Sequence, residues 1–160
     1  MTETKKPPPP NVWPSLRAND AHGLIKFLTE ALGFEATVVY AEGDTVHHAE
    51  LAWPPGGGVM LGSARPGDPQ GITRPGNLSA YVVTSDPDAL CARAVAYGAK
   101  VIQELYDTDY GSRDFAVEDP EGNRWTFGTY PGAPRSLPAG RARQRTGIGQ
   151  RRCALPIRCR

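Results

Sequence analysis

The sequence predicts an α+β fold built from two tandem βαβββ modules. Asp-Pro-Glu-Gly-Asn at residues 119–123 stands between two runs of alternating apolar and polar residues, which is the pattern of a β-hairpin with a tight turn. A similar pattern, Trp-Pro-Pro-Gly, occurs 66 residues earlier at residues 53–56. The same shift relates two aspartates that can cap helices, Asp20 and Asp86. Each unit is too small to bury a helix and a sheet by itself, so we expect the two units to pack together.

The first module is expected to cover residues 11–63. A short strand at residues 12–17 is weakened by Pro14, which suits an edge position. Asp20 caps an amphipathic helix, and Gly33 is placed to close it in the left-handed conformation. The apolar stripe of this helix is Leu24, Phe27, Leu28, Ala31 and Leu32. The remaining strands are expected at residues 37–40, 47–53 and 58–62.

Residues 64–76 are rich in Gly and Pro and predict a connector between the modules. The second module follows at residues 77–131. Its first strand is expected at 78–84, and its helix runs from Asp86, with Pro87 at the first helical position, to Gly98. The buried stripe of this helix is expected at Leu90, Ala94 and Tyr97. Its last three strands are expected at 100–106, 113–118 and 124–130.

The two ends of the chain differ from the modules in composition. Residues 1–10 are polar and then proline-rich, and residues 132–160 are dominated by Arg, Gly, Pro and Ala, so both predict disorder. The tail from residue 133 holds eight of the 18 basic residues and no acid, which leaves 10 basic and 17 acidic residues before it, a net charge of −7. An acidic body argues against nucleic-acid binding. Weak electrostatic contact with nucleic acid through the tail stays open, although a tail without function is the simpler interpretation.

Membrane insertion and disulfide bonding are not expected either. No apolar run approaches the roughly 20 residues that span a bilayer, and residues 1–10 lack the apolar centre of a signal peptide. Cys91, Cys153 and Cys159 are an odd set without metal-like or framework spacing. We therefore expect a soluble protein of the reducing cytoplasm.

The duplicated unit, the Leu-Gly-Phe sequence after the first helix and the Asp-Pro-Glu-Gly-Asn hairpin together resemble the vicinal oxygen chelate superfamily. This superfamily includes glyoxalase I, extradiol dioxygenases and bleomycin resistance proteins. The resemblance covers roughly residues 11–131 and is most specific at residues 20–34 and 119–127. It implies that the paired modules form a curved mixed-sheet cup, and residues 13–17 and 107–113 resemble the glyoxalase/bleomycin-resistance branch most closely.

Metal-dependent members of this superfamily carry a His or Glu in the first and last strand of each module. Family spacing assigns these positions to Trp13, Met60, Ser79 and Thr126. A Trp cannot ligate, and thioether and neutral hydroxyl groups are poor ligands for the divalent ions of such sites. The resemblance therefore implies a member without the family metal, and we expect no cofactor. A displaced metal site on His48 and Glu50, which share a strand face, is the alternative to a merely polar face.

Strand alternation predicts which other side chains line the cup. The expected ligand-binding residues are Trp13, Arg17, Met60, Ser79, Tyr81, Arg124 and Thr126. Ser15, His48, Glu50 and Asp114 can face the same way. Aromatic and pliable apolar contacts with a few charged groups are the composition of a small-molecule pocket.

The function expected from these residues is metal-independent binding of a small molecule, with sequestration of a natural product or antibiotic, by a protein that forms a homodimer. The alternative is a metal-free lyase or isomerase that acts on a small carbonyl compound, with weak candidate catalytic residues His48 and Glu50, or Tyr81, in proton transfer. A nucleophilic mechanism is not expected, because Cys91 lies within the second helix without a fixed His partner. The glycines at 56–58 are expected to form a hairpin turn, not a phosphate-binding loop.

Overall fold

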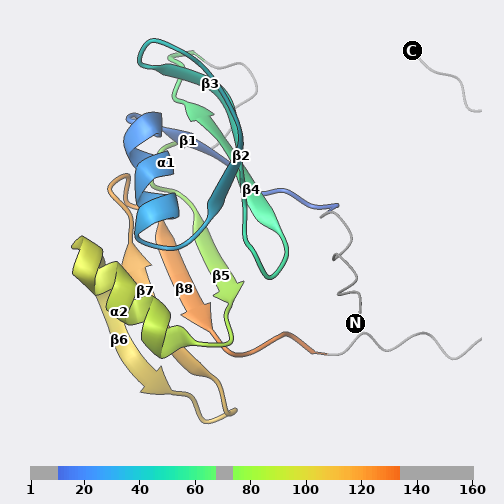
Figure 1. Ribbon diagram of the computed structural model, residues 1–160, viewed down its shortest axis with the longest axis vertical. Helices are drawn as coiled ribbons and strands as arrows, with labels where there is room; N and C mark the ends of the chain where they lie inside the picture. The colour runs from blue at the N-terminus through green and yellow to red at the C-terminus, as the bar shows by residue number, and fades with distance from the viewer. Residues whose placement is uncertain (1–10, 68–73, 134–160) are drawn as a thin grey trace, which may run out of the picture.

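The computed structural model describes residues 11–67 and 74–133 (Figure 1). The expected leader at residues 1–10, most of the tail and the middle of the connector lie outside the described residues. The described residues form two βαβββ units in succession. The predicted α+β class and tandem organisation are confirmed, and the two curved sheets form the expected cup.

The first module is a four-stranded sheet covered on one face by one helix. Strand β1 runs parallel to β4, and the other neighbours are antiparallel, in the order β1-β4-β3-β2. Its elements are β1 (Ser15–Ala18), α1 (Ala21–Glu30), β2 (Glu35–Glu42), β3 (Thr45–Ala52) and β4 (Gly58–Ser63). Strand β1 begins later than predicted, because the segment before it contains Pro14, which contributes only a carbonyl, accepting from the Met60 N–H.

The second module repeats this arrangement with the order β5-β8-β7-β6. Its elements are β5 (Ser79–Val83), α2 (Pro87–Tyr97), β6 (Lys100–Asp107), β7 (Arg113–Glu118) and β8 (Arg124–Gly128). The registers of the two sheets correspond. Ser15 pairs with Met60 in the first sheet, and Tyr81 pairs with Thr126 in the second, so both partners shift by the 66 residues of the sequence repeat.

Both helices begin as the sequence predicts. The Asp20 carboxylate accepts the backbone N–H of Gly23 at 2.8 Å, and that of Asp86 accepts from Ala89 at 2.9 Å. Helix α2 ends at Gly98, whose φ of 95° is the left-handed conformation expected there. Helix α1 ends earlier than its apolar stripe, with Ala31 as the C-cap, although Gly33 also has a positive φ. Ala31 and Leu32, at the end of the apolar stripe, are therefore buried although they lie in the turn after the helix.

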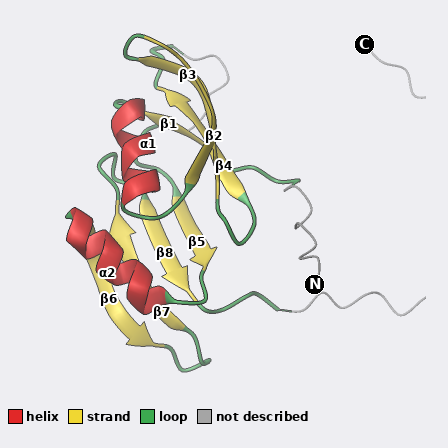
Figure 2. Cartoon of the chain, in the orientation of Figure 1, coloured by secondary structure: helices red, strands yellow, loops and turns green. Residues whose placement is uncertain are grey.

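The two modules share one hydrophobic core. Its largest fully buried side chains are Trp125, Phe115 and Phe127 of the second module and Leu24 and Leu28 of the first. Figure 2 shows both helices on the same side of the molecule. The Arg93 guanidinium on α2 donates to the carbonyls of Thr29 and Glu30 near the end of α1. The shared core makes the two modules one folding unit, as their size requires.

The expected buried stripe of α2 is partly wrong. Leu90 and Ala94 are buried, but Tyr97 is 39% exposed. Its ring meets Phe27 of α1 edge to face, with centroids 5.8 Å apart, so it seals the junction of the helices from outside. Cys91, expected to be a small buried residue, takes the inner position. Neither helix in the described part of the chain is long and apolar enough to cross a membrane.

The hairpin turn of the second module is held by its first residue. The buried Asp119 carboxylate accepts the backbone N–H groups of Glu121 and Asn123. It also accepts the side-chain N–H groups of Asn123 at 2.8 Å and Trp125 at 2.9 Å. Four donors thus satisfy one buried carboxylate, which explains why this turn combines Asp and Asn with a Gly at positive φ, Gly122.

The next residue of that turn joins the two modules. Glu121 accepts the backbone N–H groups of Asn19 and Asp20 at 2.9 and 2.7 Å, together with the Asn19 side-chain amide at 3.0 Å. These donors lie immediately before α1. A carboxylate at this place is stabilised by the positive end of the helix dipole.

Candidate functional site

The faces of the two sheets that no helix covers carry the predicted site residues. Residues paired across neighbouring strands point to the same face of a sheet. In the first sheet the pairing places Ser15, Met60 and Glu50 in one row. In the second sheet it places Tyr81 beside Thr126 and Ser79 beside Arg124.

The four positions that the family resemblance assigns to metal ligands do not fit a divalent ion. They hold an indole at Trp13, a thioether at Met60 and hydroxyl groups at Ser79 and Thr126. None of these is a good ligand for the hard cations that such sites use. In residues 11–67 and 74–133, no group of three or more His, Cys, Asp or Glu side chains is arranged to hold a metal.

Two large side chains of the first module lie over glycines of β4. A Cβ atom at Gly58 would lie 2.7 Å from the Trp13 ring. A Cβ atom at Gly62 would lie 2.6 Å from Nη1 of Arg17. Glycine at these two positions leaves room for the indole and the guanidinium beside the strand.

His48 and Glu50 come together on the same sheet. The Nε2 atom of His48 lies 3.1 Å from Oε1 of Glu50, and both side chains are about a third exposed, at 40% and 30%. Glu50 pairs with Met60 in the ladder, so the contact adjoins one of the family ligand positions. A carboxylate can orient an imidazole, which is the arrangement of a general base.

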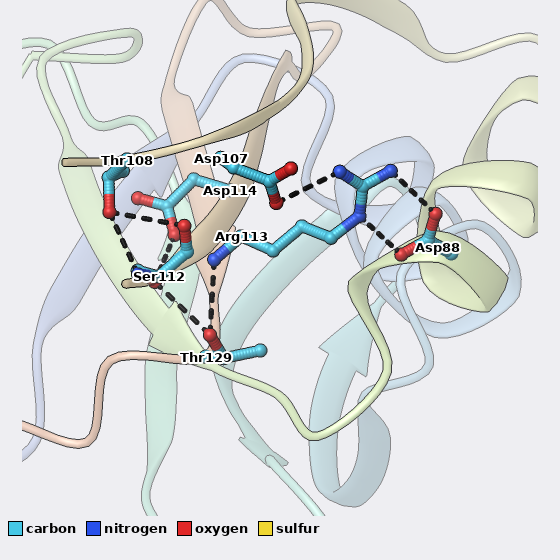
Figure 3. A network of polar contacts seen from close by, with 7 residues as sticks. All are labelled: Asp88, Asp107, Thr108, Ser112, Arg113, Asp114 and Thr129. Carbon is cyan, nitrogen blue, oxygen red and sulfur yellow. Dashed lines mark hydrogen bonds and ion pairs between the residues drawn. The ribbon is translucent and has the colours of Figure 1, made fainter. Parts of the chain in front are cut away.

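A polar network occupies the corresponding face of the second module (Figure 3). Asp114 is 2% exposed, and its Oδ1 atom accepts the Ser112 hydroxyl at 2.5 Å and the Tyr81 hydroxyl at 3.2 Å. Gly128 lies beneath them, and a Cβ atom there would collide with the Asp114 carboxylate and the Tyr81 hydroxyl. The sequence suggested Tyr81 and Asp114 for this face but not Ser112, which lies in the loop before β7.

The residues around this network hold it in place. Thr108 and Ser112 close the loop before β7 by mutual hydrogen bonds, and Thr129 accepts the Arg113 backbone N–H at 3.1 Å. The Arg113 side chain turns away from Asp114 and forms ion pairs with Asp88 at 2.7 Å and Asp107 at 3.1 Å. Figure 3 shows the guanidinium between these two carboxylates.

A cavity of about 530 Å³ lies where the two modules meet. Its walls are mostly apolar and come from the β3–β4 turn, β5, β8 and the segments at both ends of the described chain. They are formed by Val12, Pro14, Phe34, Trp53, Pro55, Gly56, Gly57, Gly58, Val59, Ala80, Tyr81, Val82, Val83, Trp125 and Pro131. Of the seven predicted ligand-binding residues, Tyr81 alone lines it.

The sequence missed Trp53 and Pro131 as cavity residues. Trp53 was assigned to a strand face, but its ring packs between Phe34 at 5.1 Å and Phe127 at 5.9 Å, and its Nε1 donates to the Val83 carbonyl. The expected hairpin turn at residues 56–58 is present, and its bare backbone forms one wall. The three glycines close to Trp53 in the sequence could have indicated the cavity, because residues without side chains leave space beside an aromatic ring.

Cys91 has the surroundings of a structural cysteine. It is buried in α2, and its burial, followed by the negative charges of Asp88 and Glu104, raises the pKa of its thiol. A raised pKa keeps the sulfur protonated and poorly nucleophilic.

Comparisons with known proteins place this architecture in a family. The family model described as the Glyoxalase/Bleomycin resistance protein/Dioxygenase superfamily matches residues 12–127. Among solved structures, the chain is similar to TioX from Micromonospora sp. ML1, with 30% identity over 71% of this chain and 93% of that one, at a TM-score of 0.60. A search of curated proteins gave no significant match.

Two structures from Streptomyces sp. CB03234 share the fold at lower identity. One is a glyoxalase/bleomycin resistance protein, with 24% identity over 71% of this chain and 94% of that chain, at a TM-score of 0.55. The other is TnmS3, an antibiotic binding protein, with 24% identity over 71% and 88%, at a TM-score of 0.56. The matched family model, the 30% identity and the paired βαβββ modules agree, and the chain belongs to the glyoxalase/bleomycin resistance protein/dioxygenase superfamily.

Proposed function

We propose that this protein binds a small molecule without a metal ion and sequesters a natural product such as an antibiotic. The observation that carries this proposal is the apolar cavity of about 530 Å³ at the module junction. Its size falls within the range of ligand pockets, and its wall combines aromatic and aliphatic groups with few polar ones. Burial of an apolar ligand there would be driven by the hydrophobic effect.

The ligand is proposed to extend from the cavity onto the open sheet faces. Tyr81 lies at the boundary, because it lines the cavity and its hydroxyl reaches Asp114 on the open face. Trp13 stands between two cavity residues and covers Gly58, a third. The remaining proposed contacts on these faces are Arg17, Met60, Ser79, Arg124 and Thr126.

The relatives support a binding role. TnmS3 is described as an antibiotic binding protein, and it shares this fold at 24% identity. The superfamily also includes dioxygenases by its own description, so the fold alone does not choose between binding and catalysis. In this chain the choice of binding rests on the cavity and on the donor set at Trp13, Met60, Ser79 and Thr126, which does not fit a metal.

A homodimer is part of this proposal. The edge strands expose large apolar side chains, among them Val39 and Tyr40 on β2 and Ile102 and Tyr106 on β6. Exposed apolar surface of this kind is typical of an interface between subunits. Light scattering should give twice the chain mass of 17.2 kDa, and a value equal to one chain would refute the dimer.

A thermal-shift screen of aromatic and glycopeptide natural products tests the binding function. A ligand that binds only the folded state raises its stability, by about 2.7 kcal/mol at a hundredfold excess over Kd. Trp13→Ala should weaken the best hit by roughly 1–3 kcal/mol, the usual cost of losing an aromatic anchor. Val95→Ala, on the exposed surface of α2, is the matched control and should leave the affinity unchanged. Absence of any hit, or equal affinities of the two variants, would count against the proposal.

Acid/base catalysis on a small carbonyl compound is the second candidate, favoured by the 3.1 Å contact between His48 and Glu50. In this case the imidazole would move a proton and the carboxylate would orient it. Mass spectrometry of a bound compound after long incubation separates the two functions. Sequestration returns the compound unchanged, whereas turnover that Glu50→Gln abolishes without loss of binding would establish the enzyme.

A further inference from the structure

We infer that the bound molecule carries a cationic amine, which lies above Asp114 against the rings of Tyr81, Tyr110 and Tyr130. This inference rests on the proposed small-molecule binding and adds the chemical class of the ligand. It is carried by three features of the second module. These are a buried carboxylate that pairs with no cation of residues 11–67 and 74–133, three exposed phenol rings beside it, and the contact of this group with the cavity.

The carboxylate of Asp114 is buried, and no cationic side chain among the described residues forms an ion pair with it. It is 2% exposed, and the neighbouring Arg113 is committed to Asp88 and Asp107. The Oδ1 atom accepts the hydroxyls of Tyr81 and Ser112, whereas Oδ2 accepts no hydrogen bond from the described residues. A buried carboxylate is stabilised most by a charged partner, and a ligand ammonium group would supply one.

Three tyrosines from different elements gather beside this carboxylate. Tyr81 belongs to β5, Tyr110 to the loop before β7, and Tyr130 to the segment after β8. The rings of Tyr110 and Tyr130 meet edge to face with centroids 5.7 Å apart, and the Tyr130 N–H donates to the Tyr81 hydroxyl at 3.2 Å. All three are well exposed, Tyr110 at 62% and the others at 43%. Aromatic faces in such a group attract cations, and most strongly where a negative charge lies behind them.

The field of Asp114 reaches the tyrosines. Partial desolvation, followed by the negative charge of Asp114, raises the pKa of Tyr110. The hydrogen bond of Thr108 opposes this rise in the pKa, and the charges of Tyr106 and Tyr81 add to it. The electrostatic potential over this group therefore favours a cation and repels an anion.

The group adjoins the cavity through two residues. Tyr81 lines the cavity, and its hydroxyl joins the network. Pro131, the residue after Tyr130, also lines the cavity. A molecule whose apolar body fills the cavity can thus place an ammonium group over the tyrosines, so one ligand satisfies both the apolar walls and the buried carboxylate.

The test compares choline with its uncharged carbon isostere, 3,3-dimethylbutan-1-ol, by NMR titration of the full-length protein with labelled tyrosine rings. Choline should shift the ring signals of Tyr81, Tyr110 and Tyr130 saturably, and the isostere should bind at least tenfold more weakly. Asp114→Asn keeps the size and an acceptor but removes the charge, and it should lower the choline affinity at least tenfold. Glu35→Gln, which removes an exposed carboxylate on β2, is the charge-matched control and should have no effect.

A second pair of variants keeps the test valid if Asp114→Asn fails to fold. Tyr110→Leu removes an exposed ring and should lower the choline affinity about fivefold, whereas Tyr110→Phe should retain it. Equal binding of choline and the isostere, no saturable shift, or unchanged affinity in Tyr110→Leu would overturn the inference. If neutral compounds bind in a manner sensitive to Trp13→Ala while choline does not bind, the proposed function stands and the cationic class is wrong.

Discussion

The turns that join the last two strands of each module occupy equivalent positions, but the side chains of their first residues make different contacts. In the second module, Asp119 accepts four N–H groups from its own hairpin. In the first module the equivalent residue is Trp53, whose ring packs against Phe34 and Phe127 and whose N–H crosses to Val83. Both turns are closed by equivalent backbone hydrogen bonds, from Trp53 to Gly57 and from Asp119 to Asn123. They differ in the side chain of the first residue, which binds its own turn in the second module and packs across the module junction in the first. Only the turn of the first module lines the cavity.

The open faces show a similar contrast. At Gly62 the first module places the Arg17 guanidinium, and at the equivalent Gly128 the second places Tyr81 and Asp114. The backbone requirement is identical, since each position needs a glycine beneath a large polar group. The charges are opposite, so the two modules share the space above the glycine but differ in its chemistry.

Asp119→Ala should produce the largest effect, because it strands two buried side-chain donors and two backbone donors. We expect the free energy of unfolding to fall by roughly 4 kcal/mol, at 1–3 kcal/mol per unsatisfied buried group with partial relaxation. Denaturant unfolding measures this change. Asp109→Ala, in an exposed loop, is the control. A loss no larger than that of the control would mean that the turn closes without its carboxylate.

Trp53→Ala should destabilise less but should change function more. The ring is half-buried, so we expect a loss of about 2 kcal/mol, together with at least a tenfold loss of affinity for a ligand identified by thermal shift. Asp119→Ala should change that affinity much less at temperatures where it remains folded. If both variants lost affinity equally, the distinction between a side chain that binds its own turn and a side chain that packs across the module junction would fail.

The smallest expected effect concerns acid. The hydrogen bond from Arg113 lowers the pKa of Asp88 below 3.8, so this pair stabilises the protein at higher pH and loses its contribution as the pH falls through the folded-state pKa. The equivalent residues of the first module are His22 and His47, which do not pair with each other. Asp88→Asn should therefore slightly reduce the dependence of the free energy of unfolding on pH below pH 4. An unchanged profile would show that the exposed pair contributes nothing.

The sequence predicted those parts of the fold that depend on local chemistry and periodicity. The capping of both helices by Asp20 and Asp86 and the strands with alternating apolar and polar residues could be predicted, because each depends on neighbours within a few positions. The repeat of 66 residues could be predicted by comparing the two halves of the sequence. The end of α1 could not be predicted, because Ala31 and Leu32 are as fully buried in the turn after the helix as they would be within it.

The cavity could not be predicted, because its walls come together only when the modules pack. Val12, Trp53, Tyr81 and Pro131 are far apart in the chain, and no spacing rule links them. The Asp114 network could be predicted in part, because strand alternation placed Tyr81 and Asp114 on the same face of the sheet. Ser112 belongs to a loop whose conformation is set by Thr108, and loop geometry is outside what alternation can indicate.

The reach of Glu121 to the start of α1 has a consequence for the order of synthesis. Its partners Asn19 and Asp20 leave the ribosome about a hundred residues earlier, so the entry to the first helix lacks this acceptor until nearly the whole domain has been made. Contacts between such distant residues slow folding, because a long loop must close before they form. The first module therefore cannot complete its contacts until the second module has been synthesised. A nascent chain that ends before Glu121 would expose its incomplete hydrophobic core to aggregation and proteolysis.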